Sequence, residues 1–415
     1  MQKPLSILVA LFGTEGDMRP LLWLAHGMAA RGHRITVHVN PRYRSLVEPH
    51  GYRVIELGTI EQFHAVLNDP RMWTPVEGTR LVLESMIDAY PLYRESLDAS
   101  GERFDLAIGT ALASGALAWA EGRNVPRLLV ALWPYGVRSA YDCPLYAPPL
   151  AWLGWMPPWF LRAAFALTDL LAGREFLDPI NAHRTTLGLR ALPSFDALTR
   201  DADAIAALFP SWYAKPQPDW PAHLAQLGFP WPQAPGPPLG DAIERFLAAG
   251  EAPIAWTHGS ANVQVEEFAR AARGATRRLR ARAIFVGPVQ DGDADFLCVP
   301  YAPFDRLLPR CRAVVHHGGI GTTVQSFAAG TPQLIVPRAH DQFDNAVRVE
   351  RIGAGAQVAF RRLDVAGAAA ALRDLTASSQ VRAACRRTRA LMAAESPLPS
   401  ACDLAERIAG RGAQD

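Results

Sequence analysis

Cysteine and lysine are scarce in this sequence of 415 residues. The five cysteines are odd in number, widely spaced and never arranged as CxxC, so the sequence predicts neither a disulfide framework nor a zinc site. They are Cys143, Cys298, Cys311, Cys385 and Cys402. Lysine occurs only as Lys3 and Lys215, and a formal net charge of +2 without a basic run gives no argument for nucleic acid as a partner. A reducing cytoplasm is the expected compartment.

Long uninterrupted apolar runs are also missing. Residues 1–12 lack the charged start and the small-residue cleavage site of a signal peptide, and the apolar run within them is too short for one. Residues 149–172 approach the length of a membrane span, but Pro157, Arg162 and Asp169 interrupt them. The sequence therefore predicts no transmembrane helix.

Residues 149–172 instead predict a helix with an excess of Trp, Phe and Leu. Exposed apolar surface on this scale usually marks a binding site, so the segment could shape an apolar pocket or touch a membrane. Packing into a core would explain the same residues. The aromatic candidates for an apolar pocket are Trp73, Trp133, Tyr135, Trp155 and Trp159.

A chain of this length, with 49% hydrophobic residues, is expected to form two domains. Prolines recur between residues 216 and 238 with little periodicity, which indicates a semi-rigid linker. The expected division is an N-terminal domain at 1–215, a linker at 216–238, a C-terminal domain at 239–393 and a last helix at 394–415.

The N-terminal half opens with a βαβ pattern. Strands are predicted at residues 5–11 and 34–39 and a helix at 21–30, with the loop GTEGD at 13–17 after the first strand. Such a loop lines a ligand-binding edge in parallel α/β sheets. Asp17 in this loop is a candidate catalytic carboxylate, although an N-cap of the helix is the alternative. Further strands are predicted at 106–108, 127–131, 254–257, 283–286 and 296–299, and helices at 81–97 and 266–279.

The most informative stretch is 313–345, AVVHHGGIGTTVQSFAAGTPQLIVPRAHDQFDN. A β-branched strand gives way to two histidines and a glycine loop, and a helix pattern starts at Thr322 and Thr323. The unpaired amides and the dipole of a helix N-terminus can hold a diphosphate. The loop has neither the GxGxxG order nor GK[ST], which excludes the dinucleotide fingerprint and the ATP-type P-loop. The candidate phosphate-binding positions are Gly318, Gly319, Gly321, Thr322 and Thr323.

A further strand is predicted at residues 333–336, and the loop after it carries Asp341 and Gln342. Ligands bind at the C-terminal ends of strands in open parallel sheets, so these two side chains should face the group attached to the diphosphate. A carboxylate beside a carboxamide offers acceptors and donors at adjacent points, which suits sugar hydroxyls.

The motif HHGGIGTT, followed about twenty residues later by PRAHDQ, resembles the donor-binding signature of the family 1 (UDP-glycosyltransferase-like) enzymes with the GT-B fold. The resemblance implies an α/β protein of two facing Rossmann-like domains with a cleft between them. It also implies that the donor binds to the C-terminal domain, and that the last helix crosses back onto the N-terminal domain. No metal and no cofactor are expected, because the helix N-terminus and a histidine stabilise the diphosphate charge.

Several residues take donor-binding roles through this resemblance. His317 matches the phosphate-binding histidine of most of the family, and His316 matches that of one branch, so both remain candidates. Tyr301 stands where many relatives have a tryptophan that stacks on uracil, with the backbone of Ala302 contacting the base edge. Gln325 replaces a glutamate that often binds ribose. The remaining donor-binding candidates are Thr14, Ser260, Asp341 and Gln342.

The resemblance also gives Asp17 a role. Many relatives have a catalytic histidine in a G-H-x-x-P motif, and Asp17 takes its place here, between Gly16 and Pro20. The bacterial branch that modifies sterols, antibiotics and lipids shares this substitution. The Asp17 carboxylate is therefore the candidate general base of an inverting sugar transfer.

The segments DPRMW at 69–73, 179–189 and 208–221 are most similar to the rhamnosyltransferase branch that makes rhamnolipid biosurfactants. This implies dTDP-L-rhamnose as the co-substrate and a 3-(3-hydroxyalkanoyloxy)alkanoate as the lipid acceptor, which would give a mono-rhamnolipid. The alternatives are a glucosyltransferase acting on a sterol, a macrolide or another lipophilic alcohol, a GT-B sugar-nucleotide epimerase, and a non-catalytic protein that binds nucleotide sugars. The expected location is the cytoplasm, with peripheral contact to the inner membrane left open.

Overall fold

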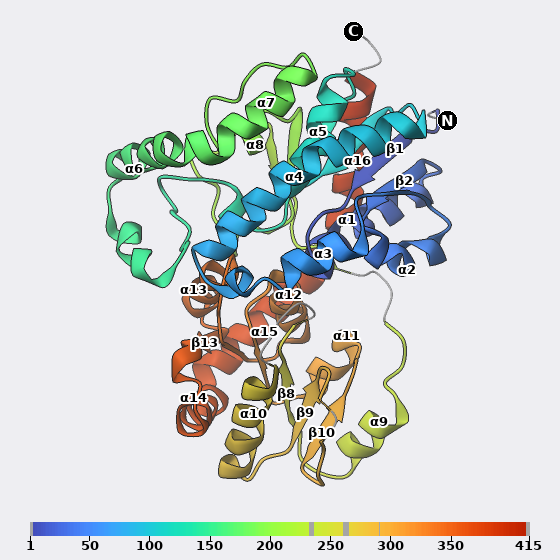
Figure 1. Cartoon of the computed structure of the whole chain (residues 1–415). Coiled ribbons are helices and arrows are strands. Elements are labelled where there is room, and N and C mark those ends of the chain that lie inside the picture. The colour runs from blue at the N-terminus through green and yellow to red at the C-terminus, as the bar shows by residue number, and fades with distance from the viewer. Residues whose placement is uncertain (1–2, 232–235, 260–264, 290, 412–415) are drawn as a thin grey trace. The chain divides into compact units, whose positions relative to one another are not determined.

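The computed structural model describes residues 3–231, 236–259, 265–289 and 291–411 (Figure 1). The chain divides into two compact units. Unit 1 comprises Met1–Leu145, Pro149–Pro230 and Ser396–Asp415, and unit 2 comprises Tyr146–Pro148 and Trp231–Glu395. Each unit is an α/β domain with its own parallel sheet, as the sequence predicted.

Within the described residues, unit 1 has a seven-stranded parallel sheet in the order β3-β2-β1-β4-β5-β6-β7. Both faces of the central strands are buried, which explains why they are continuous apolar runs rather than alternating ones. The strands are β1 (Ser6–Ala10), β2 (Arg34–Val39), β3 (Arg53–Glu56), β4 (Leu106–Gly109), β5 (Arg127–Ala131), β6 (Ala204–Ala207) and β7 (Leu224–Gln226).

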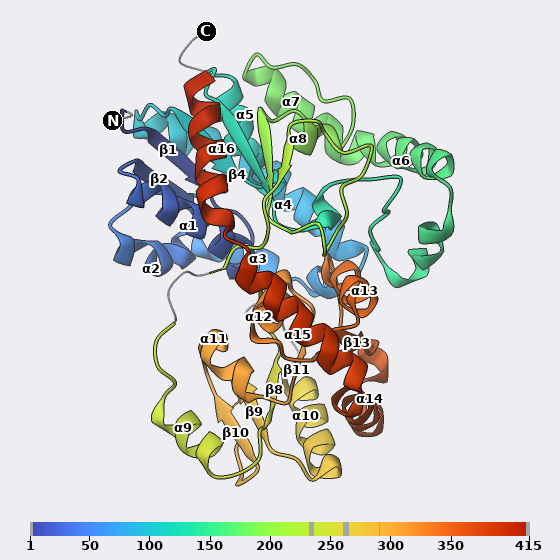
Figure 2. The ribbon, with the colours of Figure 1, turned by 180° about the vertical axis from the view of Figure 1, so that it is seen from behind.

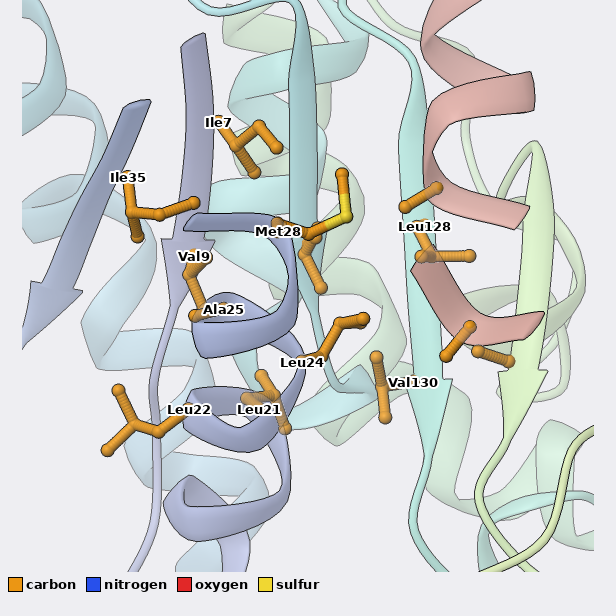
Figure 3. Close-up of a cluster of buried hydrophobic side chains, with 14 of the residues drawn as sticks. Ile7, Val9, Leu21, Leu22, Leu24, Ala25, Met28, Ile35, Leu128 and Val130 are labelled. Atoms are coloured by element: carbon orange, nitrogen blue, oxygen red, sulfur yellow. The ribbon is translucent and has the colours of Figure 1, made fainter. Parts of the chain in front are cut away.

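The largest core cluster of unit 1 lies between this sheet and the helices on one of its faces (Figure 3). Ile7 and Val9 of β1 and Val130 of β5 pack there against Leu24 and Met28 of the first helix. The helices of unit 1 are α1 (Glu15–Ala30), α2 (Arg44–Val47), α3 (Ile60–Leu67), α4 (Glu77–Ser100), α5 (Ser114–Glu121), α6 (Pro158–Ala172), α7 (Asp178–Thr186), α8 (Ala197–Arg200) and α16 (Pro397–Arg411).

Helix α16, the last of the chain, belongs to unit 1 and lies against α1 (Figure 2). Its apolar side chains, among them Ala405, are buried in the same core cluster as β1 and α1. Arg31, at the end of α1, donates hydrogen bonds to Asp403 at 2.7 Å and to Glu406 at 2.9 Å. The N-terminal domain is therefore assembled from both ends of the chain.

The described part of unit 2 has a six-stranded parallel sheet in the order β10-β9-β8-β11-β12-β13. Its strands are β8 (Ile254–Thr257), β9 (Ala283–Val286), β10 (Phe296–Val299), β11 (Ala313–His316), β12 (Gln333–Ile335) and β13 (Gly355–Gln357). Its helices are α9 (Asp241–Ala248), α10 (Val265–Leu279), α11 (Phe304–Leu307), α12 (Ile320–Ala329), α13 (Gln342–Ile352), α14 (Val365–Ala377) and α15 (Ser379–Ala394). A core rich in phenylalanine and alanine packs α10 and α14 on this sheet.

The linker predicted at residues 216–238 begins too early. Leu224–Gln226 form β7, which pairs in parallel with β6 at the edge of the N-terminal sheet, and unit 1 continues to Pro230. Three residues are too few to show a period, so the surrounding prolines dominated the sequence pattern.

Candidate active site

The C-terminal ends of the unit 2 strands gather the polar residues that the sequence singled out. Since the described strands are parallel, these ends lie at one edge of the sheet. β8 and β11 are neighbours, with Thr257 opposite His316 in the register. The next residues along the two strands, His258 and His317, therefore leave the sheet side by side. The loop after β12 leaves the same edge next to β11.

His316 is a buried structural residue. Its ring is fully buried, Nδ1 accepts the amide hydrogen of Gly318 at 3.1 Å, and Nε2 lies 3.0 Å from Oε1 of Gln333. Because Nδ1 is an acceptor, the proton belongs on Nε2, which donates to Gln333. Burial lowers the pKa of His316 to about 3, so the ring is neutral. The buried His316 ring thus holds the start of the glycine loop through its hydrogen bond with the Gly318 amide.

His317 is only half-buried and points elsewhere. Among the described residues, its Nδ1 has no hydrogen-bond partner. Burial lowers the pKa of His317 to about 4. Its Nε2 would lie 2.5 Å from a Cβ placed on Gly319, so the ring sits close above the start of α12 and leaves no room for a side chain there. Of the two histidines, His317 is the one placed to meet a ligand at this helix end.

Helix α12 begins at Ile320, with Gly319 as its N-cap, so the predicted start at Thr322 and Thr323 is wrong by two residues. The amide of Thr323 and its hydroxyl both donate to the carbonyl of Gly319 at 3.1 Å, and Thr323 is fully buried. Its polar groups are therefore used within the helix. The first-turn amides that the helix itself cannot pair are those of Ile320, Gly321 and Thr322. A Cβ on Gly321 would meet nothing within 4 Å, so this glycine is not closely packed.

The loop after β12 presents Asp341 and turns Gln342 inward. Gln342 is 4% exposed, and its Oε1 accepts from the amides of Arg338 at 2.9 Å and Ala339 at 3.3 Å. That oxygen shapes the loop rather than facing a ligand. Asp341 is half-buried and accepts a 2.6 Å hydrogen bond from Nδ2 of Asn345. Of the predicted pair, Asp341 is the better-placed group for a ligand hydroxyl.

Three further donor-site candidates lie elsewhere in unit 2. Tyr301, after β10, is 63% exposed and offers a ring face for stacking, whereas Ala302 beside it is buried. Gln325 is half-buried on α12, where its Nε2 donates to the carbonyl of Gly321 at 3.3 Å. Ser260 lies outside the described residues.

His258 and Arg338 were not among the site residues predicted from the sequence. The pKa of His258 is lowered to about 3, mainly by burial and also by its basic neighbours His317 and Arg338. Three basic groups therefore lie close together at the edge from which α12 starts. The available signal was weak, since His258 only follows a predicted strand and Arg338 is one of many arginines. Basic groups beside unpaired helix amides form an anion-binding arrangement.

In unit 1, Asp17 lies at the C-terminal end of β1. It is the third residue of α1, not its N-cap, which is Thr14. The Asp17 carboxylate accepts hydrogen bonds from the amide of Thr14 at 2.8 Å and from its hydroxyl at 3.1 Å, and so helps to close the helix end. Gly13 has a φ of +100°, and a Cβ there would lie 2.4 Å from the carboxylate, so the motif requires glycine.

The electrostatics of Asp17 suit proton transfer. Burial raises the pKa of Asp17 to about 6, although the bonds from Thr14 act in the opposite direction. A carboxylate with this pKa is ionised at neutral pH and still basic enough to accept a proton. Asp17 can therefore close the end of α1 through its hydrogen bonds from Thr14 and also act as a base.

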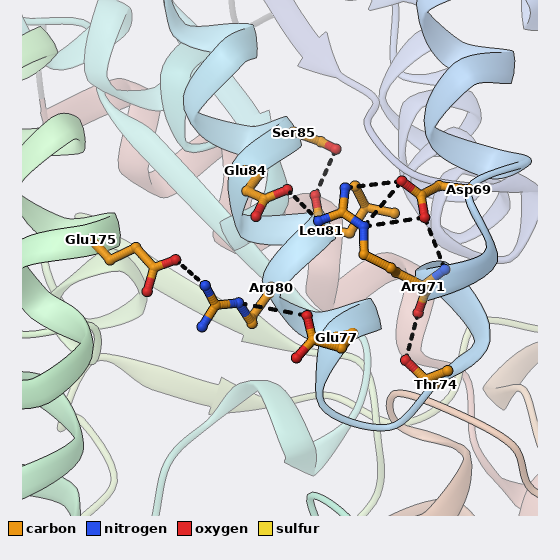
Figure 4. A network of polar contacts seen from close by, with 9 residues as sticks. All are labelled: Asp69, Arg71, Thr74, Glu77, Arg80, Leu81, Glu84, Ser85 and Glu175. Carbon is orange, nitrogen blue, oxygen red and sulfur yellow. Dashed lines mark hydrogen bonds and ion pairs between the residues drawn. The ribbon is translucent and has the colours of Figure 1, made fainter.

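The aromatic candidates of unit 1 fall into two groups. Trp73, Trp133 and Tyr135 are half-buried, and Trp133 packs against the main core cluster. Trp73 ends the short turn Pro70–Trp73, which Arg71 ties to Asp69 and to Glu84 of α4 (Figure 4). An ion pair between Arg80 and Glu175 joins the start of α4 to the segment after α6 (Figure 4). These contacts hold the Trp73 turn in a defined place.

Trp155 and Trp159 belong to the second group, which is exposed. Residues Pro148–Trp155 form a short helical segment before α6. Trp155 at the end of that segment is 87% exposed, and Trp159 in the first turn of α6 is 68% exposed. Leu167, Leu170 and Leu171, later in α6, are each more than half exposed. We call these five residues the α6 ridge. Its one acidic neighbour on α6, Asp169, pairs with Arg138 at 2.9 Å. The ridge is an unusually apolar surface for a helix that faces water.

No helix among the described residues is long and apolar enough to cross a membrane. No group of three or more His, Cys, Asp or Glu side chains in the same residues could hold a metal ion.

Comparison with known proteins places the chain in a family. Residues 294–408 match the family described as Erythromycin biosynthesis protein CIII-like, C-terminal domain. The O-mycaminosyltylonolide 6-deoxyallosyltransferase of Streptomyces fradiae is 31% identical over 434 residues, covering 98% of each protein. The solved glycotransferase of kitacinnamycin has a TM-score of 0.72 at 18% identity, covering 98% of this chain and 100% of that one. Spinosyn rhamnosyltransferase SpnG complexed with thymidine diphosphate has a TM-score of 0.65 at 19% identity, covering 95% and 98%. With two parallel-sheet Rossmann-like domains and a full-length relative of this kind, the chain belongs to the family 1 glycosyltransferases of the GT-B fold.

Proposed function

We propose that this glycosyltransferase moves L-rhamnose from dTDP-L-rhamnose onto the hydroxyl of a lipid acceptor, a 3-(3-hydroxyalkanoyloxy)alkanoate, with inversion at the anomeric carbon. The observation that carries the chemistry is the Asp17 carboxylate, which follows β1 and has a pKa raised to about 6. The α6 ridge supports an apolar acceptor. The presence of a rhamnosyltransferase with thymidine diphosphate among the structural neighbours supports the choice of donor.

In the proposed reaction, the acceptor oxygen attacks the anomeric carbon while the bond from that carbon to the diphosphate oxygen breaks. Asp17 takes the proton from the acceptor hydroxyl as the new glycosidic bond forms. The electron pair of the broken bond leaves with the diphosphate. His317 and the first-turn amides of α12 stabilise the charge that grows there. Asp341 holds a hydroxyl of the sugar ring.

A macrolide is the second acceptor class to assay directly. The relative that is 31% identical is named as a 6-deoxyallosyltransferase of O-mycaminosyltylonolide. Its name favours a 6-deoxy sugar as well as a bulky lipophilic acceptor. A sterol or another lipophilic alcohol belongs to the same class of alternatives and would make comparable use of an apolar surface.

The donor prediction compares dTDP-L-rhamnose with UDP-glucose at equal concentration. Rhamnose has no 6-hydroxyl, so its pocket should be apolar near C6 and should depend on Asp341 for the ring hydroxyls. We expect the wild-type protein to transfer rhamnose faster than glucose, with product measured by chromatography and mass spectrometry. The matched variant Asp341→Asn should lower the nucleotide-sugar affinity while dTDP affinity stays close to wild type. Faster transfer from UDP-glucose would assign the protein to the glucosyltransferases instead.

The acceptor prediction uses a series of acyl chain lengths. Each buried methylene contributes roughly 0.8 kcal/mol, so KM should fall as the acyl chains lengthen until the pocket is full. Trp155→Ser and Trp159→Ser should raise KM for long-chain acceptors and leave dTDP affinity unchanged. Ile60→Ser is the control, because Ile60 is an exposed apolar residue on α3, outside the ridge. A KM that does not depend on chain length would argue against a lipid acceptor.

The same two variants address peripheral contact with the inner membrane, which we propose for the α6 ridge. Tryptophan is favoured at the boundary between lipid and water, and the ridge carries two. Wild-type protein should sediment with anionic phospholipid vesicles more than either variant does. Equal sedimentation of wild type and variants would contradict the proposed membrane contact of the α6 ridge.

A further inference from the structure

Asn345 joins the phosphate loop to the carboxylate of Asp341. Its side chain is fully buried on α13. The Nδ2 group donates one hydrogen bond to the carbonyl of Gly318 at 2.9 Å and another to Oδ2 of Asp341 at 2.6 Å. The Asn345 amide also donates to the carbonyl of Asp341 at 2.9 Å. A carboxamide has two N–H donors, so one Nδ2 group can serve both acceptors.

The Gly318 end of this bridge is a rigid point. Gly318 has a φ of +96°, and its amide is bonded to the buried ring of His316. A Cβ there would lie 2.7 Å from a methyl carbon of Ile335 and 3.1 Å from the carbonyl of Gln342, so the loop is closely packed on two sides. Gly318 therefore cannot shift easily, and the Asn345 side chain connects it to Asp341 through two hydrogen bonds.

We propose that Asn345 is a positioning residue that fixes the sugar-binding carboxylate of Asp341 relative to the diphosphate-binding loop. The proposal rests on the function proposed above, in which Asp341 holds the sugar and the start of α12 holds the diphosphate. Asn345 itself is buried and would touch neither. Its role would be to set the distance between the two halves of the donor site, and so to make binding of the sugar depend on the geometry of the phosphate loop.

The residue type fits this role. Aspartate at the same position would place a second carboxylate against Asp341 and against the carbonyl of Gly318, where donors are needed. Leucine would have a similar volume but would leave both acceptors without this donor, and an unsatisfied buried acceptor is unfavourable. An asparagine side chain is short enough to keep both acceptors close to the helix.

The test compares two ligands on three variants: Asn345→Ser, Asp341→Asn and the double variant. Calorimetry measures the affinity for dTDP and for the nucleotide sugar, dTDP-L-rhamnose or UDP-glucose, whichever wild type binds more tightly. Asn345→Ser should weaken nucleotide-sugar binding about 10-fold or more and dTDP binding by less than about 3-fold, since hydrogen bonds to charged groups are the stronger ones. In the double variant, the loss of Asn345 should add little to the loss of Asp341.

A purely structural role gives a different result. In that case dTDP and nucleotide-sugar affinities would fall by the same factor, or the two substitutions would act additively, and either outcome would overturn the proposal. Asn181→Ser is the matched control, because the Asn181 carboxamide also makes two hydrogen bonds, to the carbonyl and from the amide of Leu192, but it lies in unit 1. It should lower the melting temperature without changing the ratio of the two affinities. Failure of the proposed donor would appear separately, as weak binding of dTDP-L-rhamnose to wild type.

Discussion

Replacing Asp17 with asparagine is expected to reduce turnover by about 10²–10⁴-fold, the usual contribution of a general base. Asparagine keeps an oxygen that can accept from Thr14, so the end of α1 should stay closed and donor affinity should be unchanged. Single-turnover rates with saturating donor and acceptor measure the effect. A variant that keeps more than half of the wild-type rate would leave Asp17 with only its capping role.

Glu15→Gln is the matched control for this experiment. Glu15 is also an acidic residue in the first turn of α1, but its side chain is 38% exposed and forms an ion pair with Arg19 at 2.7 Å. Its loss should leave turnover within a small factor of wild type. A similar loss in both variants would mean that the charge of the helix end matters and not the Asp17 carboxylate.

The raised pKa of Asp17 also fixes the direction of two pH effects. A base must be ionised, so kcat/KM should fall as the pH drops through about 6. For stability the sign is opposite, because the folded protein holds this proton more tightly than an unfolded chain, whose ordinary carboxyl pKa is 3.8. The stabilisation from Asp17 is present below that value and is lost as the pH rises through about 6. Above that pH, loss of the Asp17 charge should therefore not lower the free energy of unfolding of the asparagine variant.

Replacing His317 with alanine is expected to weaken dTDP binding by about 1–3 kcal/mol, the cost of losing a hydrogen bond to a charged group. His316→Ala should act differently, because the ring of His316 is engaged with Gly318 and Gln333 inside unit 2. That variant should lower the melting temperature first and dTDP affinity only through the distorted loop. Calorimetry with dTDP, together with thermal unfolding of both variants, separates the two roles. Unchanged affinity in His317→Ala would remove its phosphate role.

The same measurement should show a proton uptake. Burial keeps His317 neutral at pH 7 in the free protein, where its pKa is about 4. A bound diphosphate brings negative charge that favours the protonated ring, so binding should raise this pKa and draw a proton from the buffer. Titrations in two buffers of different ionisation enthalpy should give different heats in wild type, and this difference should shrink in His317→Ala.

Much of the fold could be predicted because buried parallel strands are short, continuous apolar runs. The predicted bounds of β2, β5, β8, β9 and β10 coincide with those in the structure. Helix starts were less predictable. Helix α1 begins at Glu15, well before the predicted residue 21, because Gly16 and Pro20 disguise its first turns. The start of α12 was placed two residues late, since an N-cap glycine gives no polar side chain to mark it.

The sequence could nominate residue types for the candidate site, but it could not show which of these side chains are buried in the fold and which face outward. The sequence singled out the glycine loop at 318–321, Asp17 and Asp341 as candidates, and the structure places each of them after a strand. The sequence could not decide between His316 and His317, because the two differ in burial. The side chain of His316 is fully buried in the core, whereas that of His317 is only half-buried. Gln342 and Asn345 show the same limit. A polar motif residue that bonds to a neighbouring loop cannot be told from one that meets a ligand until tertiary packing is known.

Helix α16 determines when the N-terminal domain can be complete. Strand β1 leaves the ribosome long before α16, so part of the core beside it stays open to water until Ala401, Leu404 and Ala405 have been synthesised. Unit 2 is continuous from Trp231 to Glu395 apart from three residues, so its own core is available earlier in translation. Domains usually fold in the order in which they are made. In this chain, the N-terminal domain is translated before unit 2, but its core is completed after that of unit 2. Until α16 has left the ribosome, the core beside β1 lacks this helix.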